Sequence, residues 1–211
     1  MPRPRFLKLA AEKRERILEK SAAEFAAHGF DGASLNHILG EAGISKGAAY
    51  YYFDGKADLF ATVMDHYLKH VMADAGFDIG SLTAANFWPK IRELHMQQMG
   101  HIREYPWFLG LSKALAGIPE SMMVEGPLAE MSAGQKKLFK DLVGKGQQLG
   151  VIRKDLPVGL LLRLMLALDE AGDMWFADNL ELMDPREAQR IAVRLFEGVK
   201  ALFEPRGCKR P

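Results

Sequence analysis

The chain has 211 residues, of which 48% are hydrophobic and 26% are charged, a composition that supports a packed core and excludes disordered and collagenous classes. The net charge of +1 excludes a polycation, although the first twenty residues hold seven lysines and arginines against three glutamates. Such a local basic excess is either an electrostatic footprint for phosphate or a solvated surface.

Apolar residues recur at helical spacing along the chain, and strand signals are nearly absent. The pattern predicts an all-α fold of about nine helices, with Ser34 and Ser45 as N-caps and Gly29 and Gly43 as helix ends. The expected helices cover residues 9–28, 35–42, 46–52, 56–76, 83–104 and 107–116, and three more begin near Pro127, Pro157 and Pro185. Glycines at 134, 144 and 146 weaken the first of these three.

Residues 34–53 are predicted to form two short helices joined by a tight turn at residues 43–45. Gly43 can adopt the positive φ that such a turn needs, and Ser45 caps the next helix. The apolar residues expected to pack against the first helix are Ile38, Leu39, Ala42, Ile44, Ala49 and Phe53. Since the second helix of a helix-turn-helix enters the DNA major groove by its N-terminal end, the segment predicts DNA binding.

Polar groups on this segment suit phosphate. Ser34 is expected to offer its hydroxyl and free backbone N–H groups, and Ser45 and Lys46 do the same at the next helix start. The three tyrosines at 50–52 lie about 100° apart around a helix, so one is expected to point inward and the others toward phosphates. Lys56 is a cation at a helix start, where a neighbouring phosphate would offset its unfavourable interaction with the helix dipole.

Many residue types here recur at fixed spacings: Phe25-Ala-Ala-His-Gly-Phe-Asp-Gly-Ala-Ser34, Ile38, Ala42-Gly-Ile-Ser-Lys-Gly47, Tyr50-Tyr-Tyr-Phe53, Lys56 and Leu59. Together they resemble the signature of the tetracycline-repressor (TetR) family over residues 10–65. The resemblance implies a homodimer with a helix-turn-helix DNA-binding domain at residues 1–55. It also implies a helical effector-binding and dimerisation domain at residues 56–211, and release from DNA by a small molecule.

The resemblance also assigns roles by position. Family members touch the DNA backbone at the positions of Ser34, Tyr50, Tyr51, Tyr52 and Lys56. They approach bases or nearby phosphates at the positions of Asn36, Ser45, Lys46, Gly47 and Ala48. The chain departs from the family at Ala48, often Thr, and at Ala49, often Leu. Because alanine can meet a thymine methyl but cannot hydrogen-bond, base reading is expected to depend on Asn36, Ser45, Lys46 and DNA shape.

The rest of the chain carries no family signature, and its pocket residues are inferred from apolar and aromatic composition. The candidates for effector binding are His95, Met96, Met99, Trp107, Phe108, Met123, Phe139, Met165 and Trp175. Ordinary core packing is the alternative for each. His95 and His101 lie on opposed helix faces, which argues against a metal site. The carboxylates at 169, 170 and 173 face either a cationic ligand, solvent or a subunit contact.

The helices that begin near Pro157 and Pro185 are the expected dimer contacts, because residues 158–168 are apolar almost all round. A central core helix in a monomer is the alternative. A single cysteine, Cys208, indicates a reducing compartment, and the chain shows neither a signal-peptide pattern nor an apolar run long enough for a bilayer. We therefore expect a cytoplasmic protein with no membrane partner and no cofactor.

Three functions are compared. The first is a repressor that binds a pseudo-palindromic operator on double-stranded DNA and is released by a small apolar or amphipathic effector. The second is a DNA-binding regulator controlled by a protein partner instead of a ligand. The third is an all-helical enzyme or carrier, which is disfavoured because the sequence lacks a nucleophile–base pair, a phosphate loop and a metal cluster.

Overall fold

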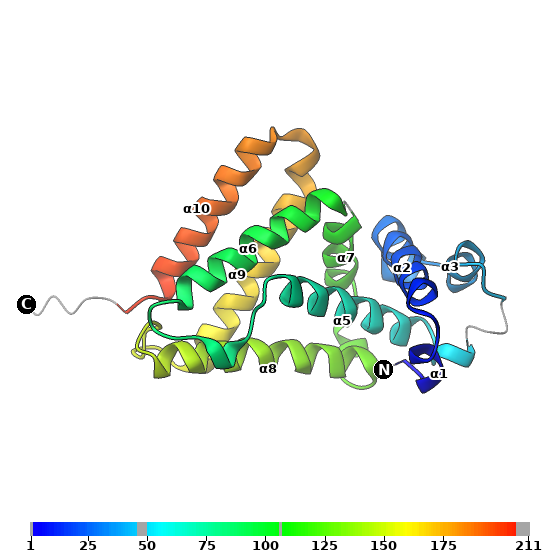
Figure 1. Cartoon of the computed structure of the whole chain (residues 1–211), viewed down its shortest axis with the longest axis horizontal. Coiled ribbons are helices and arrows are strands. Elements are labelled where there is room, and N and C mark those ends of the chain that lie inside the picture. The colour runs from blue at the N-terminus through cyan, green and yellow to red at the C-terminus, as the bar shows by residue number, and fades with distance from the viewer. Residues whose placement is uncertain (1, 46–49, 106, 206–211) are drawn as a thin grey trace, which may run out of the picture. The chain divides into compact units, whose positions relative to one another are not determined.

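The computed structural model describes residues 2–45, 50–105 and 107–205 (Figure 1). These residues form helices and no β-strand, which confirms the all-α class predicted from the sequence. Two compact units divide the chain. The first contains Met1–His70 and Tyr105–Ala133, and the second contains Val71–Glu104 and Gly134–Pro211.

The first unit holds the N-terminal helices together with a later pair. Its elements are α1 (Pro4–Leu7), α2 (Ala11–Gly32), α3 (Leu35–Glu41), most of α5 (Lys56–Asp74), α7 (Trp107–Ala116), the 3-10 turn η2 (Glu120–Met123) and the start of α8 (Pro127–Gln148). Residues 50–52 are helical as well. The helix-turn-helix segment therefore shares a unit with α7, which begins more than fifty residues after the segment ends.

Three phenylalanines form the centre of the first unit's core. The ring centroid of Phe60 lies 4.9 Å from that of Phe25 and 5.5 Å from that of Phe30, both in edge-on contact. Around them lie the buried residues Ile38, Leu39, Ala42, Ile44 and Phe53. This confirms the predicted packing of the helix-turn-helix on the first long helix, except for Ala49, which lies outside the described residues.

The first long helix continues beyond its predicted end at His28. Gly29 adopts φ 68° and ψ 178°, outside the helical region, yet one more turn follows to Gly32. Phe30 in that turn is 5% exposed. The glycine thus interrupts the regular helix as expected, and burial of Phe30 in the core stabilises the turn after it.

A short helix at the N-terminus was not predicted. α1 has only four residues, too few for an apolar period to be visible, and it places Phe6 in the core at 2% exposure. The Phe6 ring lies 4.8 Å from the ring of Phe53, between centroids. Tertiary packing, and not local propensity, fixes this segment.

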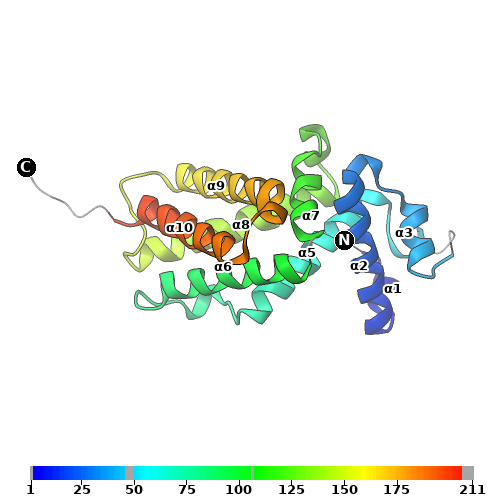
Figure 2. The same ribbon diagram turned by 90° about the horizontal axis from the view of Figure 1, so that it is seen from above.

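The second unit is a group of longer helices. Its elements are the end of α5, η1 (Ile79–Ser81), α6 (Phe87–Glu104), the rest of α8, α9 (Val158–Asn179), η3 (Leu180–Leu182) and α10 (Pro185–Phe203). In Figure 2, α10 lies between α6 and α9. The predicted start at Pro185 is confirmed, since the Asp184 carboxylate accepts a hydrogen bond from the Arg186 N–H.

Glycines in α8 do not break the helix, which runs unbroken from Pro127 to Gln148. At Gly146, close packing explains why the residue has no side chain. A Cβ atom there would lie 2.6 Å from the Ile152 side chain and 2.8 Å from the Phe87 ring. The missing side chain therefore lets two core residues of the second unit reach the helix backbone.

The two compact units do not follow a single cut in the sequence, because each is built from two separate stretches. The predicted division at residues 55 and 56 concerns function and stays a prediction. No helix in the described part of the chain is long and apolar enough to cross a membrane.

Candidate nucleic-acid interface

The start of α3 is held by a buried carboxylate on α2. The Ser34 N–H donates to Glu24 Oε1 at 2.9 Å, and the His37 ring nitrogen Nδ1 lies 2.7 Å from Glu24 Oε2. Glu24 is 8% exposed. Burial raises the pKa of Glu24, but the bonds from Ser34 and His37 favour the charged form more strongly, and the net pKa lies below its usual value.

Ser34 caps α3 as predicted, since its Oγ accepts a hydrogen bond from the His37 N–H at 3.3 Å. Its own N–H is donated to Glu24 and is not free for phosphate, in contrast to the expectation from the sequence. The Ser34 hydroxyl hydrogen is used by neither bond, and the side chain is exposed. Asn36, one residue into the helix, is exposed as well.

The turn after α3 has the predicted geometry. Gly43 adopts φ 68°, and the Ile44 N–H donates to the Leu39 carbonyl at 2.8 Å. Ile44 points into the core at 8% exposure while Ser45 faces solvent. The next three predicted DNA contacts, Lys46, Gly47 and Ala48, lie outside the described residues.

The three tyrosines divide as expected. Tyr50 and Tyr51 are 66% and 46% exposed. Tyr52 is half-buried and meets the Phe6 ring edge-on, with 6.4 Å between centroids. Two phenol hydroxyls are thus presented to solvent, where neutral O–H groups can donate to phosphate oxygens.

Lys56 has partners within the protein. Its Nζ donates to the carbonyl oxygens of Asp31 at 2.8 Å and Ala33 at 3.3 Å, and it lies 5.0 Å from the centre of the Phe30 ring. The ammonium therefore closes the C-terminal end of α2, where a cation interacts favourably with the helix dipole. Its predicted contact with the DNA backbone stays a prediction.

A cationic group that the sequence did not single out lies beside the tyrosines. The Arg5 guanidinium carbon lies 4.0 Å from the centre of the Tyr51 ring. Arg5 belongs to α1 and was noticed only as part of the basic N-terminal stretch. Nothing in its local pattern indicates which side chain it would meet 46 positions later in the chain.

The residues predicted for effector binding fall in both units. Trp107, Phe108 and Met123 are partly buried against the core of the first unit, and the Trp107 ring lies 4.5 Å from Tyr67, between centroids. In the second unit, Met165 packs against the core, Trp175 is 43% exposed, and Met96, Met99 and Phe139 are half-buried. Their shared role as an effector site stays a prediction.

His95 has a clear structural environment. Its Nε2 lies 3.2 Å from the Ala192 carbonyl of α10, and its ring stacks on Phe196 with 5.9 Å between centroids. Burial lowers the pKa of His95, partly opposed by the bond to that carbonyl. A neutral His95 that donates from Nε2 therefore joins α6 to α10.

Asp169 and Asp173 lie one turn apart on α9. Solvent reaches Asp169, yet surrounding protein atoms raise its pKa to about 7, and the negative charge of Asp173 adds to the effect. The predicted contact of this carboxyl with a cationic ligand stays a prediction.

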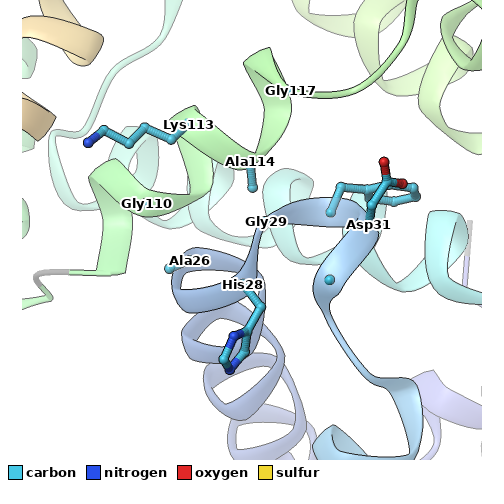
Figure 3. A pocket seen from close by; sticks show the side chains of 10 residues that line it. Ala26, His28, Gly29, Asp31, Gly110, Lys113, Ala114 and Gly117 are labelled. Carbon is cyan, nitrogen blue, oxygen red and sulfur yellow. The ribbon is translucent and has the colours of Figure 1, made fainter.

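A pocket of about 260 Å³ lies in the first unit, between the end of α2 and α7 (Figure 3). Gly29, Asp31, Gly110, Lys113 and Gly117 are among its lining residues. None of the predicted effector residues contributes to it. Among these lining residues, Gly110 of α7 faces Ala26 of α2, where a Cβ atom on the glycine would lie 2.5 Å from the Ala26 Cβ.

Known proteins resemble the chain in both sequence and fold. The family described as "Bacterial regulatory proteins, tetR family" matches residues 17–63. The "Probable acrEF/envCD operon repressor" of Escherichia coli K12 is 23% identical over 206 residues, which cover 93% of this chain and 89% of that protein.

Solved structures share the helical arrangement. The fatty acid degradation regulator FadR from Bacillus halodurans superposes with a TM-score of 0.73 at 15% identity, covering 97% of this chain and all of that one. FadR from Bacillus subtilis, in complex with stearoyl-CoA, gives 0.66 at 18% identity and covers 89% and 96% of the two chains. At these identities the likeness concerns the fold.

Proposed function

Because the chain belongs to the tetR family of bacterial regulatory proteins, we propose that it is a repressor that binds a pseudo-palindromic operator as a homodimer. A small apolar or amphipathic effector releases it. Residues 1–55 supply DNA binding, and residues 56–211 supply effector binding and dimerisation.

One observation carries the DNA-binding part. In the described part of residues 17–63, which match the family, α2, α3 and the turn at Gly43 bury their apolar residues, while the polar residues Ser34, Asn36, Ser45, Tyr50 and Tyr51 are exposed. Hydroxyl and amide groups of this kind position a helix on DNA through its phosphates. Base edges would then be approached by Asn36 on α3 and by Ser45 and Lys46 at the start of the recognition helix.

The homodimer is supported by the surface of α9. Leu161 and Phe176 are buried on one side of the helix. On another side, Leu160 and Trp175 are each 43% exposed, and Ala167 and Ala171 between them are exposed as well. These four residues follow one another at helical spacing, so they form an apolar stripe that a second copy would cover.

The effector part is supported by the relatives and by composition. The Bacillus subtilis regulator is solved with stearoyl-CoA, which is amphipathic. In this chain the half-buried side chains Met96, Met99 and Phe139 belong to the second unit, where flexible apolar groups suit a ligand of that class. Binding there would favour a state that does not fit the operator.

The proposal is tested by selecting duplexes from a random-sequence library and measuring affinity by fluorescence anisotropy. We expect a palindromic sequence that binds at about 10⁻⁸ M or tighter. Lys46→Ala should weaken binding. It should also make the slope of log affinity against log salt concentration shallower by about 0.9 for each lost phosphate contact. Tyr50→Phe should weaken binding without changing the slope, because the hydroxyl is neutral.

Lys137→Ala is the matched control, since this exposed lysine on α8 pairs with Asp141 and lies in the second unit. It should leave affinity and slope unchanged. If the wild-type protein enriches no sequence from the library, the proposal is wrong.

A further inference from the structure

The N-terminal arm, residues 2–9, is ordered against the tyrosine segment. It precedes residues 17–63, which match the family. Phe6 anchors it in the core through Phe53. The Arg3 N–H donates to the Tyr52 carbonyl at 2.9 Å, and the Arg3 guanidinium pairs with Asp54.

A second set of bonds holds the other end of the arm. Arg14 Nη1 on α2 donates to the carbonyls of Leu7 at 3.0 Å and Leu9 at 2.7 Å. The arm is therefore attached at both ends and in its middle. Ordering a chain segment costs conformational entropy, and these contacts offset that cost before any ligand is present.

Arg5 lies between these attachments and has a different environment. Its side chain is exposed, and its guanidinium covers the face of the Tyr51 ring at 4.0 Å. Stacking uses the flat face of the guanidinium and leaves the N–H groups along its edges to point outward. A phosphate can accept two parallel hydrogen bonds from such an edge.

We propose that the arm is part of the DNA interface and that Arg5, held on Tyr51, binds a backbone phosphate beside the one reached by the tyrosines. This inference rests on the proposed function. It adds a contact made by residues before the family's helix-turn-helix. Arg3 acts as a positioning residue, because its own charge is already paired with Asp54.

The charge around the arm favours DNA as the partner. Lys8, Lys13, Arg16 and Lys20 are exposed on α1, its end and the first half of α2. Arg5 lies on the exposed ring of Tyr51, and the neighbouring Tyr50 is exposed as well, so a cation and a phenol hydroxyl are presented together to solvent. A polyanion with regularly spaced phosphates can bind such a surface without reading bases.

The test compares Arg5→Ala with wild type on the selected operator from about 50 to 200 mM salt. Each phosphate contact adds about 0.9 to the slope of log affinity against log salt concentration. One contact therefore changes the salt-induced loss of affinity by about 3.5-fold over that range. The ratio of variant to wild-type Kd should therefore fall about 3.5-fold with rising salt, or about twelve-fold if both protomers of a dimer contribute. The melting temperature should not change.

A double-mutant cycle with Tyr51→Ala separates the stacked arrangement from charge alone. If the ring positions Arg5, the loss of operator affinity caused by Arg5→Ala should be smaller in the Tyr51→Ala background. In the Tyr51→Phe background, which keeps the ring, the loss of affinity should be the same as in wild type. Lys137→Ala, which removes one positive charge elsewhere, should change neither affinity nor slope.

The outcomes are distinguishable. If wild type binds its operator and Arg5→Ala has the same affinity and slope, the arm makes no phosphate contact and this inference is wrong while the proposed function stands. Wild-type protein that selects no DNA overturns the proposed function instead.

Discussion

Glu24 joins two parts of the DNA-binding segment that are ten residues apart. Its carboxylate accepts from the Ser34 backbone and from His37, and His28 Nε2 lies 3.8 Å away. A buried carboxylate is costly without such partners. The start of α3, and with it the direction of the Ser34 hydroxyl, therefore depends on this one side chain.

The effect of Glu24 on stability should depend on pH. Because its pKa lies below 4.5 in the folded protein, the unfolded chain binds more protons as the solution is acidified. The contribution of Glu24 to the free energy of unfolding is fully present above its pKa in the unfolded chain. It is lost as the pH falls through its lower pKa in the folded protein. We expect Glu24→Gln to be destabilised by about 1–2 kcal/mol at pH 7, with the difference shrinking below pH 4.5.

Urea denaturation between pH 3 and 7 measures this difference. Glu12→Gln is the control, because Glu12 is an exposed carboxylate of the same helix. A stability difference between Glu24→Gln and wild type that is constant across this range would contradict the argument.

The contact between α2 and α7 depends on a glycine. A Cβ atom on Gly110 would lie 2.5 Å from the Cβ of Ala26 and 2.9 Å from its Cα. Backbone atoms cannot swing aside as the end of a long side chain can. The two helices approach closely because both present their smallest residues at this point.

We expect Gly110→Ala to destabilise the protein by about 1–3 kcal/mol, since overpacking outweighs the gain in helix propensity of about 1 kcal/mol. Gly134→Ala in α8 is the matched control, because nothing lies within 4 Å of its Cβ position. That variant should be neutral or more stable than wild type. Equal stability of the two variants in chemical denaturation would show that the close approach is unimportant.

At the scale of the molecule, the proposed homodimer predicts that the exposed apolar stripe on α9 forms the contact between the two copies. Leu160→Glu combined with Trp175→Glu should convert the proposed dimer to a monomer in analytical ultracentrifugation, because buried unpaired carboxylates would face each other at the interface. Operator affinity should fall when the dimer is lost, since a monomer contacts only one half-site.

Val124→Glu is the control for this variant. Val124 is 77% exposed, follows η2 and belongs to the first unit, whereas the stripe belongs to α9 of the second unit. It should leave the mass and the operator affinity unchanged. A double variant that sediments like wild type would remove α9 from the dimer interface.

Much of the interface could be predicted because its signals are local. Ser34 and Gly43 act on backbone groups within a few residues of themselves, and their cap and turn appear where the sequence puts them. Lys56 shows the limit. Its partners Asp31 and Ala33 are more than twenty residues away, and no spacing within a helix indicates that they will meet.

The sequence by itself determined the helical class, the turn of the helix-turn-helix and its buried face, because helix periods, caps and glycine conformations are properties of short segments. Only the tertiary structure decided the partners of Arg5, Glu24 and Lys56 and the approach of Gly110 to Ala26. Each joins residues that folding brings together from separate segments. Such contacts follow from packing of the whole unit, which carries no periodic signal in the chain.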